Sequence, residues 1–159
     1  MLETTTLKYS LGFKLPKRLF SDHQFVLALG AGCCLSFLAG GLAGEHAKFD
    51  TGWLSLVLLV FGAPLLEEIV FRGVIQGYFG VNNAVHTQYL AGLSSANLLT
   101  ALLFMTSQLL YNTDLFAWLA FFPALVFGYF RERHDSLLPG VILHSAFNSA
   151  LISGWYLGT

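Results

Sequence analysis

Apolar residues in this chain gather into five long stretches, and the short segments between them hold most of the charged residues. A helix that crosses a membrane needs about 20 predominantly apolar residues. The five stretches are close to that length or longer, and they cover residues 24–44, 53–79, 89–111, 115–130 and 137–157. We therefore predict an all-α fold, a polytopic transmembrane helical bundle of about five spans.

The second stretch, residues 53–79, is longer than one crossing of the bilayer requires, and it carries Pro64 near its middle. Proline removes a backbone N–H and clashes with the preceding turn, so it kinks or breaks a helix. Membrane proteins tolerate such a site where other groups satisfy the freed backbone. We predict a kink or a broken helix near Pro64. If the break creates a re-entrant pair, the number of spans and the side of the C-terminus both change.

The first stretch, residues 24–44, is rich in small residues. Small residues allow helices to approach closely in lipid. The glycines are Gly30, Gly32, Gly40, Gly41 and Gly44. Cys33 and Cys34 are adjacent in the same stretch, and we interpret them as small packing residues rather than as a disulfide.

Basic residues predict the orientation of the chain. Four of them precede the first stretch, and two more follow the fourth stretch at Arg131 and Arg133. With alternating spans these basic segments fall on one side, which is the cytoplasmic side by the positive-inside rule. We expect a basic cytoplasmic leader over residues 1–23 and a single transmembrane domain over residues 24–159. The expected location is a prokaryotic inner (cell) membrane, with the N-terminus in the cytoplasm.

Composition supports a membrane protein and argues against one class of partner. The chain is 55% hydrophobic and only 11% charged, with a mean hydropathy of +0.66, whereas soluble domains are about 25% charged. The net charge is −1, and the chain has no basic stripe. We therefore expect no binding to nucleic acid.

Two adjacent carboxylates, Glu67 and Glu68, lie inside the second apolar stretch, and Arg72 follows Glu68 by four residues. A charge costs roughly 2.5–3.5 kcal/mol at the centre of a membrane helix, so charges there are usually functional. Residues four apart share a helix face, so Glu68 and Arg72 can form an ion pair. Glu67 lies about 100° away around the helix and can act as a general base. A structural bridge between helices is the alternative.

The fifth stretch carries a second polar pair, His144 and Asn148, again four residues apart. Together they can polarise a carbonyl group and stabilise an oxyanion. They can equally form hydrogen bonds between helices, and the pair alone favours that structural role. A third polar position is Gln108, four residues after Phe104.

Three motifs in this order and with this approximate spacing resemble the motif set of the CPBP family, which comprises CAAX-prenyl-endopeptidase and bacteriocin-processing membrane proteins, also called Abi proteins. The motifs are Glu67-Glu68-x-x-x-Arg72, Phe104-x-x-x-Gln108 and His144-x-x-x-Asn148. Flanking residues agree as well, namely Phe71 and Gly73 around Arg72, and Leu138-Pro139 before the histidine. The resemblance covers about residues 55–150.

The resemblance implies roles for these residues. Glu67 would be the general base that activates a water molecule, with Glu68 and Arg72 in support. His144 and Asn148 would bind the scissile carbonyl and its oxyanion.

The second motif departs from the family at Gln108, where relatives normally have a histidine that orients or deprotonates the water. Glutamine forms hydrogen bonds but does not shuttle a proton near pH 7. Three outcomes are open: Glu67 carries the proton alone while Gln108 positions the water, another histidine substitutes, or the chain is a non-catalytic relative. The remaining histidines lie in predicted loops or span ends, at His23, His46, His86 and His134.

We expect no cofactor. Zinc is the alternative, because members of the family have been labelled metalloproteases. Catalytic zinc takes three protein ligands, often from an H-E-x-x-H sequence, and the chain has no such sequence. Glu67, Glu68 and His144 can be combined into a metal site, but a metal-free glutamate mechanism is favoured.

The leading hypothesis is an intramembrane endopeptidase of the glutamic type. It would cleave membrane-associated or exported proteins, so its partners would be a peptide or protein substrate and the lipid bilayer. Gln108 motivates the alternative, a non-catalytic membrane scaffold or immunity protein of the same family. A small transporter or channel that uses Glu67 and Glu68 as a proton or cation site is the third reading.

Overall fold

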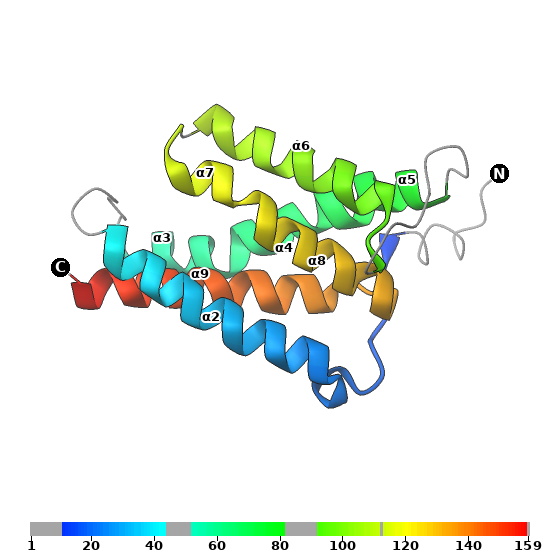
Figure 1. Ribbon diagram of the computed structural model, residues 1–159, viewed down its shortest axis with the longest axis horizontal. Coiled ribbons are helices and arrows are strands. Elements are labelled where there is room, and N and C mark those ends of the chain that lie inside the picture. Colours follow the sequence, from blue (N-terminus) through cyan, green and yellow to red (C-terminus); the bar gives the residue numbers. More distant parts are fainter. Residues whose placement is uncertain (1–10, 44–51, 82–91, 112, 159) are drawn as a thin grey trace. The chain divides into compact units, whose positions relative to one another are not determined.

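The computed structural model describes residues 11–43, 52–81, 92–111 and 113–158, and within these ranges the regular structure is helical. Figure 1 shows the long helices beside the interrupted helix of the second stretch. They are α2 (His23–Ala43), α6 (Ser95–Tyr111), α8 (Phe121–His134), preceded by the short α7 (Leu115–Leu119), and α9 (Leu138–Gly158). The prediction of an all-α helical bundle is confirmed. A single 3-10 turn, η1 (Leu19–Ser21), precedes α2.

The helix of the second stretch continues through Pro64. It runs over 28 residues, Trp53–Gly80, and its winding changes along its length. The segments are α3 (Trp53–Val57), η3 (Leu58–Gly62), α4 (Ala63–Glu68), η4 (Ile69–Ile75) and α5 (Gln76–Val81), of which η3 and η4 are π-helical. The interruption predicted near Pro64 therefore takes the form of π-helical winding, and a broken or re-entrant helix is wrong for the described residues.

Pro64 lies two residues after the first π segment, and a neighbouring helix satisfies the backbone there. In a π-helix each N–H bonds to the carbonyl five residues earlier, so the missing N–H of Pro64 leaves the Leu59 carbonyl without that partner. The side-chain amide of Asn148 on α9 donates to this carbonyl at 3.0 Å. A neighbouring helix thus supplies the hydrogen bond that proline cannot.

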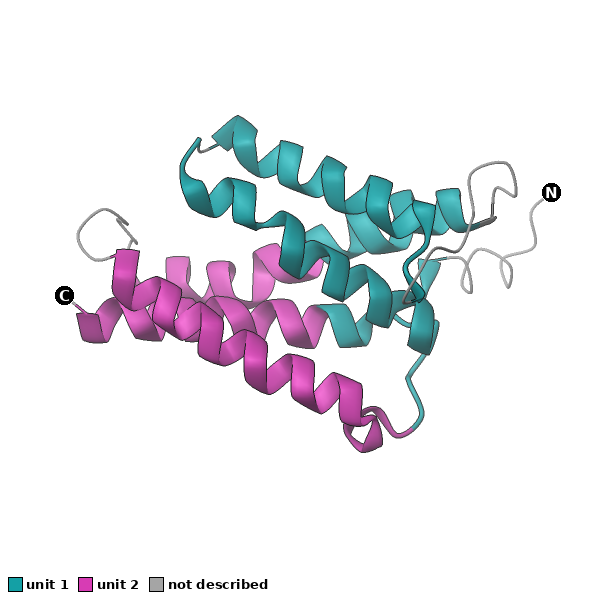
Figure 2. Cartoon of the chain, in the orientation of Figure 1, with its two compact units in different colours: residues 1–17, 67–140 teal, residues 18–66, 141–159 magenta. Residues whose placement is uncertain are grey.

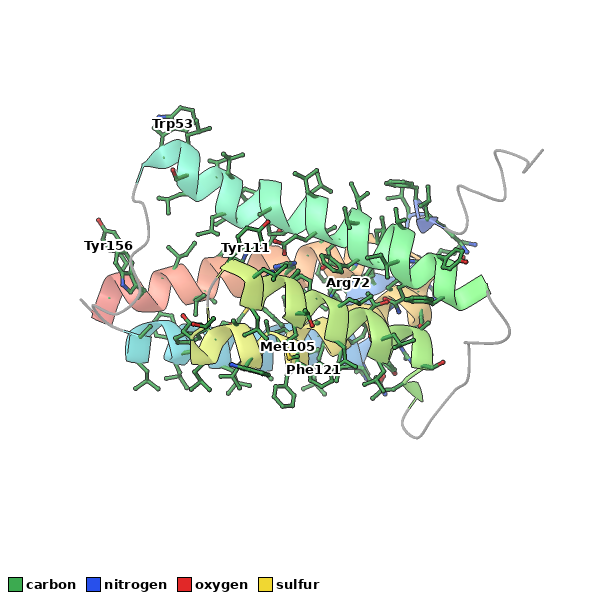
Figure 3. All side chains as sticks on the ribbon, turned by 90° about the horizontal axis from the view of Figure 1, so that it is seen from above. Trp53, Arg72, Met105, Tyr111, Phe121 and Tyr156 are labelled. Carbon is green, nitrogen blue, oxygen red and sulfur yellow. The ribbon has the colours of Figure 1, made fainter. Side chains whose placement is uncertain are left out.

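Three of the described helices are long and apolar enough to cross a membrane: His23–Ala43, Trp53–Gly80 and Leu115–His134. Five spans were predicted. The described part of the third predicted span, α6, has 17 residues, and the sequence before it lies partly outside the described residues. α9 has 21 residues, but His144, Asn148 and several serines interrupt its apolar sequence. The protein is an integral membrane protein, whose helix ends carry exposed aromatic residues such as Trp53 and Tyr156 (Figure 3).

The chain divides into two compact units, shown in Figure 2. Unit 1 comprises Met1–Lys17 and Glu67–Gly140, and unit 2 comprises Arg18–Leu66 and Val141–Thr159. The expected division into a leader of residues 1–23 and one domain of residues 24–159 stays a prediction.

Unit 1 is built on the packing of α6 against α8 (Figure 1). The buried residues of α6 recur every three or four positions, so they form one face of the helix. Ala101 and Phe104 on that face form a core cluster with Ala124 of α8. The small alanines bring the helices close together, and the ring of Phe104 fills the remaining space.

Residues 11–14 bind to the connection between α8 and α9, also within unit 1. The Leu137 N–H donates to the Gly12 carbonyl at 2.9 Å, and the Ser136 hydroxyl donates to the Lys14 carbonyl. The Lys14 ammonium lies 3.2 Å from the Asp135 carboxylate. Part of the predicted leader is therefore an ordered component of unit 1.

Unit 2 contains α2 and α9, which approach each other through glycines. A Cβ at Gly40 would overlap the Leu151 carbonyl, and a Cβ at Gly154 would overlap the Phe37 carbonyl. Gly32 faces the ring of Phe147 in the same way. The close packing that the glycines of residues 24–44 predicted is present at Gly32, Gly40 and Gly41. Gly30 has open space around it, and Gly44 lies outside the described residues.

Candidate active site

Glu68 and Arg72 form a fully buried ion pair in unit 1. The Arg72 Nη1 atom lies 3.1 Å from the Glu68 Oε1 atom, and the two side chains are 1% and 0% exposed. The pairing that the spacing of four residues predicted is confirmed. Glu68 ends α4 and Arg72 lies in η4, so the pair sits where the helix changes from α to π winding, a feature common at functional sites.

Arg72 is held on further sides by α6 and α8. Its Nη2 atom donates to the Ala124 carbonyl at 3.1 Å. Its guanidinium carbon lies 4.7 Å from the centre of the Phe104 ring and 5.4 Å from that of Phe127. Cation–π attraction of this kind strengthens when water is excluded. The arginine labelled in Figure 3 is thus fixed by one carboxylate, one carbonyl and two aromatic rings.

Glu67 differs from its neighbour in exposure. Glu68 is completely buried, whereas Glu67 is half-buried. Adjacent residues of a helix point about 100° apart, so the two carboxylates face different surroundings, although the charge of Arg72 attracts both. Glu67 is therefore the carboxylate of this pair that retains access from outside the unit 1 core.

Gln108 lies on α6, four residues after Phe104, and its side chain is half-buried. This spacing is about 6 Å along a helix axis. Phe104 is in contact with Arg72, so the second motif is anchored at its first residue beside the ion pair. Gln108 lies one turn further along the same helix.

His144 and Asn148 lie in unit 2, one turn apart on α9. His144 is 8% exposed and Asn148 is half-buried. The hydrogen bond from Asn148 to the Leu59 carbonyl shows that one N–H of the amide has a structural role. An amide has two N–H groups, so Asn148 has the chemistry to donate a second hydrogen bond.

Comparison with known proteins identifies the family of this chain. The family described as "Type II CAAX prenyl endopeptidase Rce1-like" matches residues 49–150, which include all three motifs and more than half of the chain. The protein belongs to this family. No curated protein and no solved structure matches the chain.

Membership in the CAAX prenyl endopeptidase family confirms the resemblance that the three motifs indicated. It points to protease activity in general. The roles of the individual residues stay predictions, including the effect of Gln108.

The structure describes two of the four remaining histidines, His23 and His134. His23 begins α2, and His134 ends α8 with its ring stacked on Phe130 at 6.1 Å between centroids. His46 and His86 lie outside the described residues. A substitute for the missing histidine of the second motif is therefore not identified among the described residues.

The described residues contain no group of three or more His, Cys, Asp or Glu side chains that could hold a metal ion. The metal-free mechanism and its zinc alternative both stay predictions.

Sequence reasoning missed three features that surround the buried ion pair. Phe127 completes the aromatic contacts of Arg72. Gly140 of α9 packs directly against the Glu68 carboxylate. The third is a buried polar network beyond Arg72, in which the Gln76 amide donates to the Gly128 carbonyl and to Glu132. A glycine in the first turn of an apolar helix was the available signal for Gly140, but only the structure identifies its neighbour.

Proposed function

We propose that this protein is an intramembrane endopeptidase in which Glu67 activates the attacking water molecule. The observation that carries the proposal is the unequal environment of the two adjacent carboxylates. Glu68 is engaged by Arg72 inside the unit 1 core, and Glu67 is the partly accessible one. General-base catalysis requires a carboxylate that can accept a proton and reach water, and the partial exposure of Glu67 supports that role.

The buried ion pair supports this mechanism by positioning Glu67. A charge that is buried and paired in a rigid environment holds the helix at a defined rotation. The contacts of Arg72 with Ala124, Phe104 and Phe127 come from two other helices of unit 1. Glu67 therefore projects from a segment whose orientation three helices determine.

His144 and Asn148 are proposed to bind the scissile carbonyl group. A donor at the carbonyl oxygen stabilises the negative charge that develops there when water attacks. The bond from Asn148 to Leu59 fixes the direction of that side chain before substrate arrives, which is the preorganisation that such a donor requires. Gln108 is proposed to position the water, because an amide can donate to and accept from it.

The proposed substrates are membrane-associated or exported proteins, cleaved without a metal ion. We propose that the protein resides in a prokaryotic inner membrane with its N-terminus in the cytoplasm, as the basic residues near that end predict.

The test is a comparison of protein termini in host cells that carry the natural protein, Glu67→Gln, or the control Asp114→Asn at equal abundance. Asp114 caps α7 by accepting from the Ala117 N–H, and asparagine caps equally well, so the control removes the same charge without changing the site. We expect a small set of cleaved ends to disappear with Glu67→Gln alone.

Identical termini in all three strains would contradict the proposal. That result would favour the alternative, a non-catalytic scaffold or immunity protein of the same family, because Gln108 already departs from the catalytic pattern. Restoring histidine with Gln108→His then shows whether the substitution is the cause.

A further inference from the structure

Gly140, in the first turn of α9, lies against the carboxylate of Glu68. A Cβ atom placed on Gly140 would overlap the Glu68 Oε2 atom, and it would stand 3.2 Å from the carboxylate carbon and 3.7 Å from Cγ. Both residues are buried and both belong to unit 1. The backbone of α9 therefore occupies the side of the carboxylate that Arg72 does not.

The contacts of the Glu68 carboxylate with Arg72 restrain it from shifting to make room for a side chain at position 140. Its other oxygen, Oε1, is 3.1 Å from the Arg72 guanidinium, and Arg72 is held by the Ala124 carbonyl and the Phe104 ring. Interiors of this density transmit a displacement to their neighbours. An added methyl group would therefore rotate the carboxylate or shift the helix that carries it.

The start of α9 also suits a carboxylate electrostatically. The backbone dipoles of a helix place partial positive charge at its N-terminus, and α9 is 21 residues long. The carboxylate of Glu68 is thus placed between two positive groups, the arginine and the helix end.

We propose that Gly140 is a positioning residue: the absence of a side chain there lets Glu68 contact α9, and this contact sets the direction of Glu67. The inference rests on the proposed function, because it assigns the base to Glu67 and the anchoring role to Glu68. It adds a residue outside the three motifs that controls the geometry of the first motif.

The first measurement does not depend on activity. Thermal unfolding in detergent is compared for Gly140→Ala in the natural background and in the Glu68→Asp background. Aspartate keeps the charge but is one methylene shorter, so it withdraws from α9. We expect Gly140→Ala to lower the unfolding temperature by several degrees in the natural background and much less with Glu68→Asp. If Gly140→Ala fails to accumulate, recovery of accumulation in the double variant is the same result.

The second measurement is cleavage of a substrate found by the comparison of termini. Displacement of a catalytic group by about 1 Å can cost about 100-fold in rate, so we expect Gly140→Ala to lower kcat strongly with little change in KM. Adding Glu68→Asp should recover part of that loss. The matched control is Gly30→Ala on α2, because a Cβ at Gly30 meets nothing within 4 Å.

The two proposals fail in different ways. Equal effects of Gly140→Ala on unfolding in both backgrounds would overturn the contact with Glu68, whether or not the protein cleaves anything. A normal kcat for Gly140→Ala, with cleavage lost in Glu67→Gln, would overturn the positioning role and leave the protease function standing. Coupled unfolding temperatures in a protein without cleavage would keep the contact and reject the function.

Discussion

Units 1 and 2 differ in what they bury and in how their helices pack. Unit 1 buries an ion pair and surrounds it with a carbonyl group and aromatic rings. Unit 2 brings two helices together through glycines, with backbone against backbone. A buried charge is stable only while every partner remains in place, whereas close glycine packing depends on shape alone. Unit 1 is therefore expected to be sensitive to lost charges, and unit 2 to added volume.

The largest effect is expected from removing Arg72. Arg72→Ala leaves the Glu68 carboxylate buried without its counter-charge, and breaking such a pair costs about 3–5 kcal/mol. Accumulation in the membrane and thermal unfolding in detergent measure the loss. The control is Arg133→Ala, because Arg133 is exposed. The double replacement Glu68→Met with Arg72→Met should recover much of the stability, and no recovery would contradict the view that the charges themselves are the cause.

A smaller effect is expected from adding a methyl group between α2 and α9. Gly40→Ala would press a Cβ against the Leu151 carbonyl, and overpacking of this kind costs about 1–3 kcal/mol. Gly30→Ala, on the same helix, has open space around the added atom and should be neutral or slightly stabilising. Thermal unfolding of the two variants side by side is the measurement. Equal behaviour would show that the glycines do not determine the approach of the helices.

The hydrogen bond from Asn148 to Leu59 should contribute less. Asn148→Leu removes it, and hydrogen bonds between membrane helices contribute about 0.6–2 kcal/mol. Pro64→Ala restores the N–H that the Leu59 carbonyl lacks, so the loss from Asn148→Leu should shrink in that background. Unfolding temperatures of the single and double variants measure this coupling. An unchanged loss would mean that the proline does not create the need for the bond.

The smallest effect is expected at the ion pair of Lys14 and Asp135, whose side chains are 48% and 49% exposed. Exposed pairs contribute about 0.2–1 kcal/mol, so Lys14→Ala should lower the unfolding temperature only slightly. Salt should reduce even that difference. A large loss would show that the backbone bonds of residues 11–14 depend on this pair.

Much of the fold was predictable because apolar stretches, glycines and charged residues act locally. The all-α class follows from stretches long enough to cross a membrane, and the pairing of Glu68 with Arg72 follows from their spacing of four. The behaviour at Pro64 was not predictable, because it depends on whether a partner for the Leu59 carbonyl exists. That partner, Asn148, lies 89 residues away along the chain.

The three motifs, their order and the apolar stretches around them can be read from the linear sequence. The sequence alone therefore indicates the family and identifies Glu67 as the candidate base. The inequality of the two carboxylates is decided by tertiary structure. Glu68 is buried between Arg72, which packs in turn on the Phe104 ring of α6, and Gly140 of α9. Burial and charge pairing depend on what surrounds a side chain, and distant segments of the chain supply those surroundings.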